Sequence, residues 1–193
     1  PRCGSRARQR FLWRYLQRSG LVSESVRLLH VAPEAELARR LRHATDYVSA
    51  DVDAGAAMVE ADLTALPFAA GSFDLVLCSH VLEHVPDDAA AIAEIFRVLA
   101  APGVALIQSP VNHEQALTYE DPGETDPDAR LRRFSQADHV RVFGTDIRER
   151  LERPGFAVTI VSADDVDADE AKRYGLGRGA WPMRNDIYRC ERT

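Results

Sequence analysis

Apolar residues along this chain gather into short runs, and the runs alternate with segments of helical periodicity. The clearest run, FDLVLCS at residues 73–79, is continuous rather than alternating. Continuous runs of this length are typical of strands that are buried on both faces, as in a parallel sheet. The predicted strands are residues 26–32, 47–50, 58–61, 73–79, 104–108 and 156–161, with a last strand at 187–190 that pairs with the sixth.

Helical spacing appears between these runs. Residues 34–43 place Leu37 and Leu41 on one face, and Pro33 suits the first turn of that helix. Asp87 is a good N-cap for a following helix, which Pro102-Gly103 is expected to break. The alternation of strands and helices predicts an α/β fold with a doubly wound, mostly parallel sheet. Two further helices are expected, one before the first strand on Phe11, Leu12, Tyr15 and Leu16, and one from Thr145 to Pro154-Gly155.

Length and composition argue against several classes of protein. With 193 residues the chain is long enough for one α/β domain, and a net charge of −6 disfavours a general nucleic-acid-binding surface. No apolar run approaches the roughly 20 residues of a membrane span. Three distant cysteines form no disulfide framework, so a reducing cytoplasm is the simplest compartment. The cysteines are Cys3, Cys78 and Cys190.

Acidic residues follow the first three strands in succession. The first strand leads into Ala32-Pro33-Glu34, the second ends at Asp51 and Asp53, and the third ends at Asp62. In a nucleotide-type cofactor site, the first turn takes the charged end of the ligand and an acid after the second strand takes a ribose diol. Each residue alone is also a common strand or helix cap. Together, in this order, they favour a cofactor site.

A polar cluster ends the fourth strand. Ser79, His80, Glu83 and His84 follow the apolar run directly, and ligands of open α/β sheets bind beyond the carboxyl ends of the strands. The cluster is therefore either a site edge or a simple cap that begins the next helix. His80, Glu83 and His84 are also the residue types of a metal site, but we expect no metal.

Residues 111–141 break the pattern and are polar, acidic and rich in turns. Loops of this length are usually functional or disordered. Because the segment follows the fifth strand, it should lie over the same end of the sheet, with His113, His139 and Tyr119. Its acids would favour a cationic or polar substrate if they faced the site, and are otherwise merely solvated. These acids are Glu114, Glu120, Asp121, Glu124 and Asp126.

Several motifs resemble those of one family. They include YVSAD at 47–51, Asp62-Leu63, SFDLVL at 72–77 and HVLEHV at 80–85. With these, the chain resembles the class I S-adenosylmethionine-dependent methyltransferases. It is most similar to a type 11-like bacterial subgroup without an assigned substrate. Features shared with that subgroup are TYEDP at 118–122, the Gln-x-Asp-His-Val-Arg run at 136–141, the late Arg-Tyr-Gly-Leu at 173–176, and Cys3-Gly4-Ser5 as the remnant of a Cys-rich segment.

The resemblance implies a seven-stranded Rossmann-like sheet with its last strand antiparallel, and S-adenosylmethionine as the cofactor. It implies that Asp51 holds the ribose, that Asp62 holds the adenine amine with Leu63 nearby, and that Ser79 and His80 border the methionine portion. It also divides the chain into an N-terminal helical extension at 1–22 and a methyltransferase domain at 23–193, with a substrate-side insertion at about 111–141. The expected cofactor-binding residues are His30, Ala32, Pro33, Glu34, Asp51, Asp53, Asp62, Leu63, Ser79 and His80.

The first loop departs from the family pattern. The family places three glycines there after an acidic residue, whereas residues 30–36 contain no glycine. Glycine lets the backbone approach a ligand closely, so the absence of glycine bears on how the cofactor is bound. Glu34 could pair with the cofactor's ammonium, with His30 as its support or as a core residue. Alternatively, Glu34 is a helix-start acid favoured by the macrodipole.

The expected function is methyl transfer to a small molecule, with His80, His139 and Tyr119 as the catalytic candidates. Methyl transfer mainly requires positioning, with a base only where the acceptor carries a proton. His84 and His113 are further candidate bases. Two alternatives are kept: a degenerate protein that binds the cofactor without catalysis, and another nucleotide-binding α/β enzyme. A dehydrogenase would want Gly-x-Gly-x-x-Gly after the first strand, which is absent.

Overall fold

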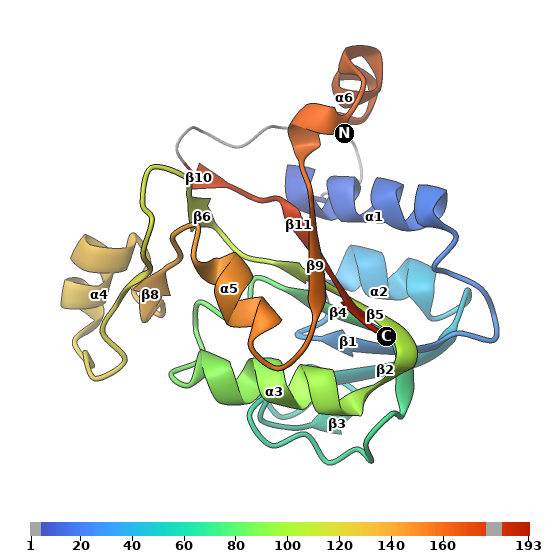
Figure 1. Ribbon diagram of the computed structural model, residues 1–193, viewed down its shortest axis with the longest axis horizontal. Helices are drawn as coiled ribbons and strands as arrows, with labels where there is room; N and C mark the ends of the chain where they lie inside the picture. Colours follow the sequence, from blue (N-terminus) through green and yellow to red (C-terminus); the bar gives the residue numbers. More distant parts are fainter. Residues whose placement is uncertain (1–4, 177–182) are drawn as a thin grey trace.

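The computed structural model describes residues 5–176 and 183–193, and its centre is a seven-stranded sheet (Figure 1). The strand order is β3-β2-β1-β4-β5-β11-β9. The strands from β3 to β5 pair in parallel, while β11 is antiparallel to both of its neighbours. The predicted doubly wound sheet with an antiparallel last strand is therefore confirmed. The strand bounds are β1 Arg27–Val31, β2 Asp46–Asp51, β3 Val59–Glu60, β4 Phe73–Ser79, β5 Leu99–Gln108, β9 Ala157–Val161 and β11 Ile187–Arg192.

Helices cover both faces of the sheet because alternate side chains of each strand point to opposite sides. On β4, Leu75 and Leu77 pack with α1 (Ala7–Ser19) and α2 (Ala35–Leu41). Val76 and Cys78 pack instead with α3 (Asp88–Val98) and α5 (Ile147–Glu152). Both sets are buried, which explains why the strand is apolar throughout. Figure 1 shows the two pairs of helices on opposite sides of the sheet.

Two predicted boundaries are wrong by a few residues. The helix after Asp87 ends at Val98, and Leu99 is already extended at the start of β5. Pro102-Gly103 therefore does not break the helix but lies within β5, where the pairing with β4 skips from Leu99 to Val104. The helix expected from Thr145 begins one residue later, with Asp146 as its N-cap.

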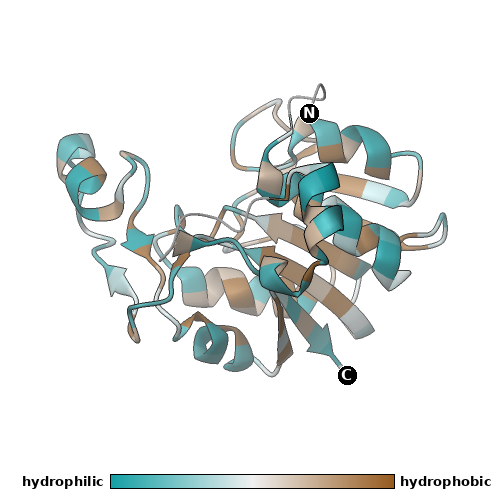
Figure 2. Ribbon diagram, turned by 90° about the horizontal axis from the view of Figure 1, so that it is seen from above, coloured by the Kyte–Doolittle hydropathy of each residue, from teal (hydrophilic) through white to brown (hydrophobic). Residues whose placement is uncertain are grey.

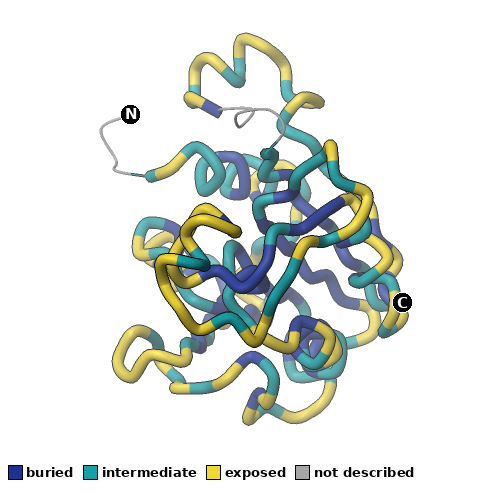
Figure 3. The backbone as a smooth tube through the Cα atoms, turned by 90° about the vertical axis from the view of Figure 1, so that its left-hand side faces the viewer, coloured by how far each residue is buried: buried dark blue, intermediate teal, exposed yellow. Residues whose placement is uncertain are grey.

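The segment 111–141 is ordered by short elements of its own. It contains β6 (Val111–Asn112), β7 (Tyr119–Glu120) and α4 (Pro127–Phe134), and β7 pairs with β8 (Arg141–Val142). Figure 2 shows α4 standing out from the body of the molecule, and Figure 3 shows that much of this region is exposed. We call residues 111–141 the insertion.

The tail after β9 also carries structure that the sequence pattern did not predict. It forms a 3₁₀ turn η1 (Ala163–Asp165), helix α6 (Ala168–Tyr174) and strand β10 (Met183–Arg184), which pairs with β6. Cys3 and Gly4, the expected remnant of a Cys-rich segment, lie outside the described residues. None of the helices in the described part of the chain is long and apolar enough to span a membrane.

Candidate functional site

The carboxyl ends of β1, β2, β3 and β4 lie at one edge of the sheet and carry most of the predicted site residues. His30 is fully buried on β1, and Ser79 is buried at the end of β4. Asp51 ends β2, and Asp62 follows β3. Because these strands are parallel neighbours, the sheet brings together residues that are up to 50 positions apart.

The loop after β1 lacks glycine but keeps a glycine-like backbone. Ala32 has φ +46°, in the left-handed region that side chains rarely adopt. Its amide donates to the carbonyl of Ala50 at 2.9 Å, which ties the loop to β2. The conformation that glycine would supply is thus present here despite the alanine side chain. Pro33 and Glu34 follow, with Glu34 as the N-cap residue of α2.

Glu34 and His30 form a buried pair beneath this loop. His30 Nε2 lies 3.1 Å from Glu34 Oε2, and His30 Nδ1 lies 3.1 Å from the Tyr47 hydroxyl. Burial of Glu34 opposes its ionisation, but the nearby His30 ring and Ser79 hydroxyl outweigh burial, so the pKa of Glu34 lies below its ordinary value. Its other oxygen, Oε1, is buried without a hydrogen-bond partner in the described residues. A buried, ionised oxygen without a partner is suited to a cationic ligand group.

Asp51 and Asp62 each use one oxygen to shape their own turn. Asp51 Oδ1 accepts from the Asp53 amide at 3.0 Å, and Asp62 Oδ1 accepts from the Thr64 amide and hydroxyl, both at 2.8 Å. Asp53 itself is exposed, whereas Leu63 is buried. The second oxygen of Asp51 and of Asp62 makes no hydrogen bond to the described residues, so each can accept from a ligand hydroxyl or amine.

His80 and Glu83 form a second buried pair at the end of β4. His80 has φ +57°, and its Nδ1 lies 3.0 Å from Glu83 Oε1. Glu83 is 1% exposed and accepts from the Ser109 hydroxyl at 2.9 Å. Burial opposes the ionisation of Glu83, but His80 outweighs it, so the pKa of Glu83 is lowered.

This pair sets the tautomer of His80. A ring nitrogen beside a carboxylate is favourable only when it carries the proton, so Nδ1 is protonated and Nε2 presents its lone pair. Nε2 is buried and has no hydrogen-bond partner in the described residues. An oriented imidazole with an unused lone pair is equipped to take a proton. The strained backbone of His80 is typical of a residue whose position serves function.

The insertion brings His139 next to this pair. The amide of Val140 donates to the Glu83 carbonyl at 3.0 Å, and the His139 ring meets the His84 ring edge-on with centroids 4.6 Å apart. Burial of His139 lowers its pKa, although Glu83 acts in the opposite direction, so the ring is neutral near pH 7. His84 is one-third exposed, and its Nδ1 lies 3.3 Å from Asp138 Oδ2.

Glu83, His84 and His139 together offer ligand atoms within 4.8 Å of one another. From the sequence, His80, Glu83 and His84 were the candidate metal ligands. In the structure His80 faces Glu83, and His139 takes the place of His80 in the cluster. His139 lies 55 residues after His84 in the chain, so sequence spacing could not have identified these three residues as a cluster.

Tyr119 and His113 lie apart from the His80–Glu83 pair. Tyr119 is 46% exposed on β7 and packs against Phe134 of α4, with ring centroids 5.5 Å apart. His113 Nε2 lies 3.3 Å from Asp186 Oδ2. Among the described residues no contact joins Tyr119 to His80 or His139, so its predicted role finds no support in the geometry.

Most acidic residues of the insertion form ion pairs or cap a helix within the protein. Asp121 pairs with Arg133 at 2.5 Å, Glu124 also reaches Arg133, and Asp126 caps α4. Glu120 is held by Arg141 and Arg150. Since these four acids already have partners within the protein, the expectation that the acids of the insertion select a cationic substrate is not supported.

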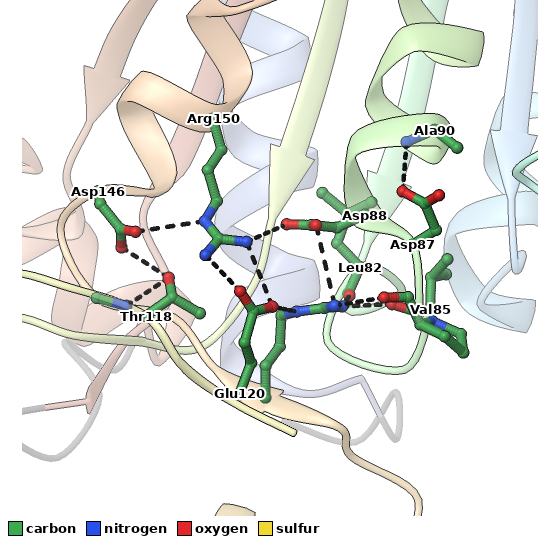
Figure 4. A network of polar contacts seen from close by, with 12 residues as sticks. Leu82, Val85, Asp87, Asp88, Ala90, Thr118, Glu120, Asp146 and Arg150 are labelled. Atoms are coloured by element: carbon green, nitrogen blue, oxygen red, sulfur yellow. Dashed lines mark hydrogen bonds and ion pairs between the residues drawn. The ribbon is translucent and has the colours of Figure 1, made fainter. Parts of the chain in front are cut away.

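A buried arginine docks the insertion against the loop after β4 (Figure 4). Arg141 is fully buried, and its guanidinium donates to the carbonyls of Leu82, Val85 and Pro86. Its Nε donates to Glu120 at 3.0 Å. Hydrophobic periodicity assigns Arg141 no role, because a buried arginine interrupts an apolar pattern in the same way as an exposed one.

Arg150 of α5 completes this network from the other side. It donates to Asp88 at 2.9 Å and to Glu120 at 2.7 Å, and it lies 3.3 Å from Asp146. Burial opposes its charge, but the hydrogen bonds that it donates to Glu120 and Asp88 outweigh burial, so the pKa of Arg150 is raised. The network fixes the loop that carries His80 and Glu83.

A separate hollow of about 550 Å³ lies between α1, α2 and α6, away from the predicted site residues. Three of the arginines that line it already contact other groups of the protein. Arg10 donates to the carbonyls of Tyr174 and Gly175, Arg14 pairs with Glu170, and Arg40 stacks on Trp13. These contacts hold α6 on α1, so the hollow is a gap between packed helices.

Comparisons with known proteins indicate one family. A family model described as a methyltransferase domain matches residues 10–107. An uncharacterised methyltransferase of Mycobacterium sp. (strain JLS) is 42% identical over 72 residues, which are 34% of this chain and 29% of the relative. A ubiquinone biosynthesis O-methyltransferase of Psychrobacter cryohalolentis is 48% identical over 40 residues, 21% of this chain and 16% of the relative. The chain therefore matches less than a third of the length of these relatives.

Solved structures share the fold at low identity. An S-adenosylmethionine-dependent methyltransferase from Mesorhizobium loti superposes with a TM-score of 0.67 at 16% identity, covering 93% of this chain and 97% of the other. The [4+2]-cyclase SpnF superposes with a TM-score of 0.66 at 18% identity, covering 95% and 81%. At this identity the likeness shows the fold alone, and the second name belongs to a different reaction.

Proposed function

Because the chain belongs to the methyltransferase-domain family, we propose that it transfers a methyl group from S-adenosylmethionine to a small molecule. The observation that carries this proposal is the succession of Glu34, Asp51 and Asp62 at the ends of three neighbouring strands. Each of these carboxylates has an oxygen that makes no hydrogen bond to the described residues. The arrangement supports a ligand that has an ammonium at one end and a ribose and an adenine at the other.

The residues present fit this cofactor. Asp51 would accept from the ribose hydroxyls, Asp62 from the adenine amine, and Glu34 from the ammonium. The unpartnered Oε1 of Glu34 is the feature that calls for a ligand, because a buried charged oxygen left bare is costly. The left-handed turn at Ala32 supports the approach of backbone to the ligand without glycine.

When bound, S-adenosylmethionine supplies an electrophilic methyl group on a sulfonium centre. His80 would remove the acceptor's proton where the acceptor carries one, taking it on Nε2. Glu83 holds the Nδ1 side of the ring and would stabilise the imidazolium formed. His139, neutral and buried beside Glu83, would help to exclude water and position the acceptor.

Calorimetric titration tests the cofactor assignment. We expect the full chain to bind both S-adenosylmethionine and S-adenosylhomocysteine, and Asp51→Asn to weaken both by at least about tenfold, since a charge-assisted hydrogen bond contributes roughly 1.5–3 kcal/mol. The matched control is Asp46→Asn, which removes the same charge from the opposite end of the same strand and should change neither affinity. Failure of the unmodified chain to bind either ligand would overturn the proposal.

A second candidate is a protein that binds the cofactor without transferring its methyl group. The observation that favours it is the glycine-free loop at 30–36, together with a structural neighbour named for cyclisation. His80→Gln separates the two functions. If the chain is a transferase, this variant loses methyl transfer to an acceptor that the unmodified chain methylates, by a larger factor than any loss of affinity for S-adenosylmethionine. If the chain only binds, no acceptor among phenols, amines, thiols and carboxylic acids yields S-adenosylhomocysteine above the rate without protein.

A further inference from the structure

The hollow between α1, α2 and α6 is cationic, although the chain as a whole has a net charge of −6 (Figure 1). Its volume of about 550 Å³ lies in the range of small-molecule sites. Among the described residues that line it, Glu36 is the one acid, and Glu36 is paired with Arg39 at 2.7 Å. A concave surface lined by one sign of charge concentrates small ions of the opposite sign. The lining cations are Arg10, Arg14, Arg40, Lys172 and Arg173.

Three of these cations have no anionic partner within the protein. Arg10 and Arg14 serve the packing of α6 on α1. In contrast, the side chains of Arg40, Lys172 and Arg173 make no ion pair or hydrogen bond in the described part of the chain. All three are exposed, so they keep the rotamer freedom to close on a ligand. Because they come from two helices that face one hollow, one anion placed between α2 and α6 can contact all three.

Two aromatic side chains give the hollow a flat, apolar wall. Trp13 of α1 and Tyr174 of α6 both line it and are partly exposed. The guanidinium carbon of Arg40 lies 5.3 Å from the centre of the Trp13 ring, and that of Arg173 lies 5.5 Å from the centre of the Tyr174 ring. Guanidinium groups and aromatic rings both stack on planar groups. A planar ring in the hollow therefore has stacking partners directly beside the cations.

We propose that this hollow binds a phosphorylated small molecule with a planar ring, of the nucleoside monophosphate class. The ring would pack against Trp13 and Tyr174, with the phosphate among Arg40, Lys172 and Arg173. A phosphate monoester carries a charge of about −1.5 to −2 near pH 7 and three acceptor oxygens, which suits three separate cations better than a carboxylate does. The proposal goes beyond methyl transfer and does not depend on it, since no residue that lines the hollow belongs to the predicted cofactor site.

Three probes test the proposal by calorimetry on the full chain. Guanosine 5′-monophosphate (GMP) carries both ring and phosphate, guanosine lacks the phosphate, and ribose 5-phosphate lacks the ring. GMP also lacks the adenine that the candidate cofactor site is expected to hold. We expect GMP to bind at least tenfold more tightly than either of the other two, and saturating S-adenosylhomocysteine to leave its affinity unchanged.

Variants assign the two ends of the ligand. Arg40→Gln and Lys172→Gln should each weaken GMP by about three- to tenfold, because each removes one charge-assisted contact at an exposed site. Trp13→Leu should weaken GMP by a similar factor and leave ribose 5-phosphate unchanged. The matched control is Arg39→Gln, which removes the same charge from the next residue of α2, outside the lining of the hollow, and should change no affinity. An unchanged melting temperature shows that each variant folds.

Four results would overturn the proposal: no binding of GMP, equal affinity for GMP and either fragment, equal weakening by Arg39→Gln and Arg40→Gln, or displacement of GMP by S-adenosylhomocysteine. The last result would place GMP in the cofactor site. Binding of GMP by a chain that does not bind S-adenosylhomocysteine would support this site while overturning the proposed methyl transfer, so the two proposals fail separately.

Discussion

The guanidinium of Arg141 donates through Nη1 to the backbone carbonyl of Leu82 at 2.6 Å, across 59 residues of chain. Leu82 belongs to the loop that carries His80 and Glu83, and Arg141 ends the insertion that carries His139. One buried side chain therefore fixes the distance between the two halves of the candidate catalytic site. The motifs TYEDP and Gln-x-Asp-His-Val-Arg meet here, because Glu120 and Arg141 are direct partners at 3.0 Å.

Removal of the positive charge of Arg141 should destabilise the protein. We expect Arg141→Met to lower the free energy of unfolding in urea by about 3–5 kcal/mol, because it leaves three carbonyls and part of the Glu120 carboxylate buried without a donor. Arg132→Met is the control, since Arg132 lies on α4 with its side chain 70% exposed and should cost no more than about 0.5 kcal/mol. A loss under 1 kcal/mol for Arg141→Met would show that the network is dispensable.

The strands were predictable because each apolar run reflects burial on both faces, which is a local property. Leu75 and Leu77 serve one layer of helices and Val76 and Cys78 the other, so the whole run must be apolar. The strand ends were predictable for the same reason, and with them most of the cofactor-binding candidates.

The docking of the insertion was not predictable in this way. Arg141 donates to backbone carbonyls that lie 55 or more residues earlier, and nothing in the local pattern singles it out. The helix boundary at Val98 was missed because Leu99 fits the apolar face of α3 and also pairs with Phe73 in the sheet. Contacts distant in sequence decide both cases.

The turn at Ala32 should be relieved by glycine. At φ +46° an alanine is strained by about 1–2 kcal/mol, which exceeds the chain entropy that glycine adds to the unfolded state. We expect Ala32→Gly to raise the free energy of unfolding by roughly 0.5 kcal/mol. Ala50→Gly, in the adjoining strand β2, is the control and should lower it by roughly 0.5–1 kcal/mol. If both variants are destabilised equally, the left-handed turn is not a source of strain.

The lowered pKa of His139 predicts how stability depends on pH. In the unfolded chain this histidine binds a proton near pH 6.5, whereas burial keeps it neutral in the folded protein until a lower pH. Between those two values the unfolded state binds more protons, so the free energy of unfolding falls as the pH is lowered. Its full contribution to stability is present only above about pH 6.5.

His139→Gln isolates this contribution. Urea unfolding measured from pH 5 to pH 8 should show a shallower decline at the acid end for His139→Gln than for the unmodified chain. Glu34 and Glu83 have lowered pKa values in the folded protein, so they add to the decline only toward pH 5, where the unfolded chain begins to bind their protons, and this addition is common to both chains. His43→Gln removes an exposed histidine and should leave the slope unchanged. Identical slopes for His139→Gln and the unmodified chain would mean that folding does not change the pKa of His139.

The cluster of Glu83, His84 and His139 should work without a metal ion. Although its ligand atoms lie within 4.8 Å of one another, Glu83 already accepts from Ser109 and faces His80, and His84 Nδ1 faces Asp138. A metal would have to compete with Ser109 and His80 for Glu83 and with Asp138 for His84. We therefore expect dialysis against EDTA to leave less than 0.1 equivalent of zinc, manganese or iron on the protein and to leave the melting temperature and cofactor affinity unchanged. One equivalent of retained metal, lost in Glu83→Gln but not in Glu114→Gln, would instead identify a metal site at this end of the sheet.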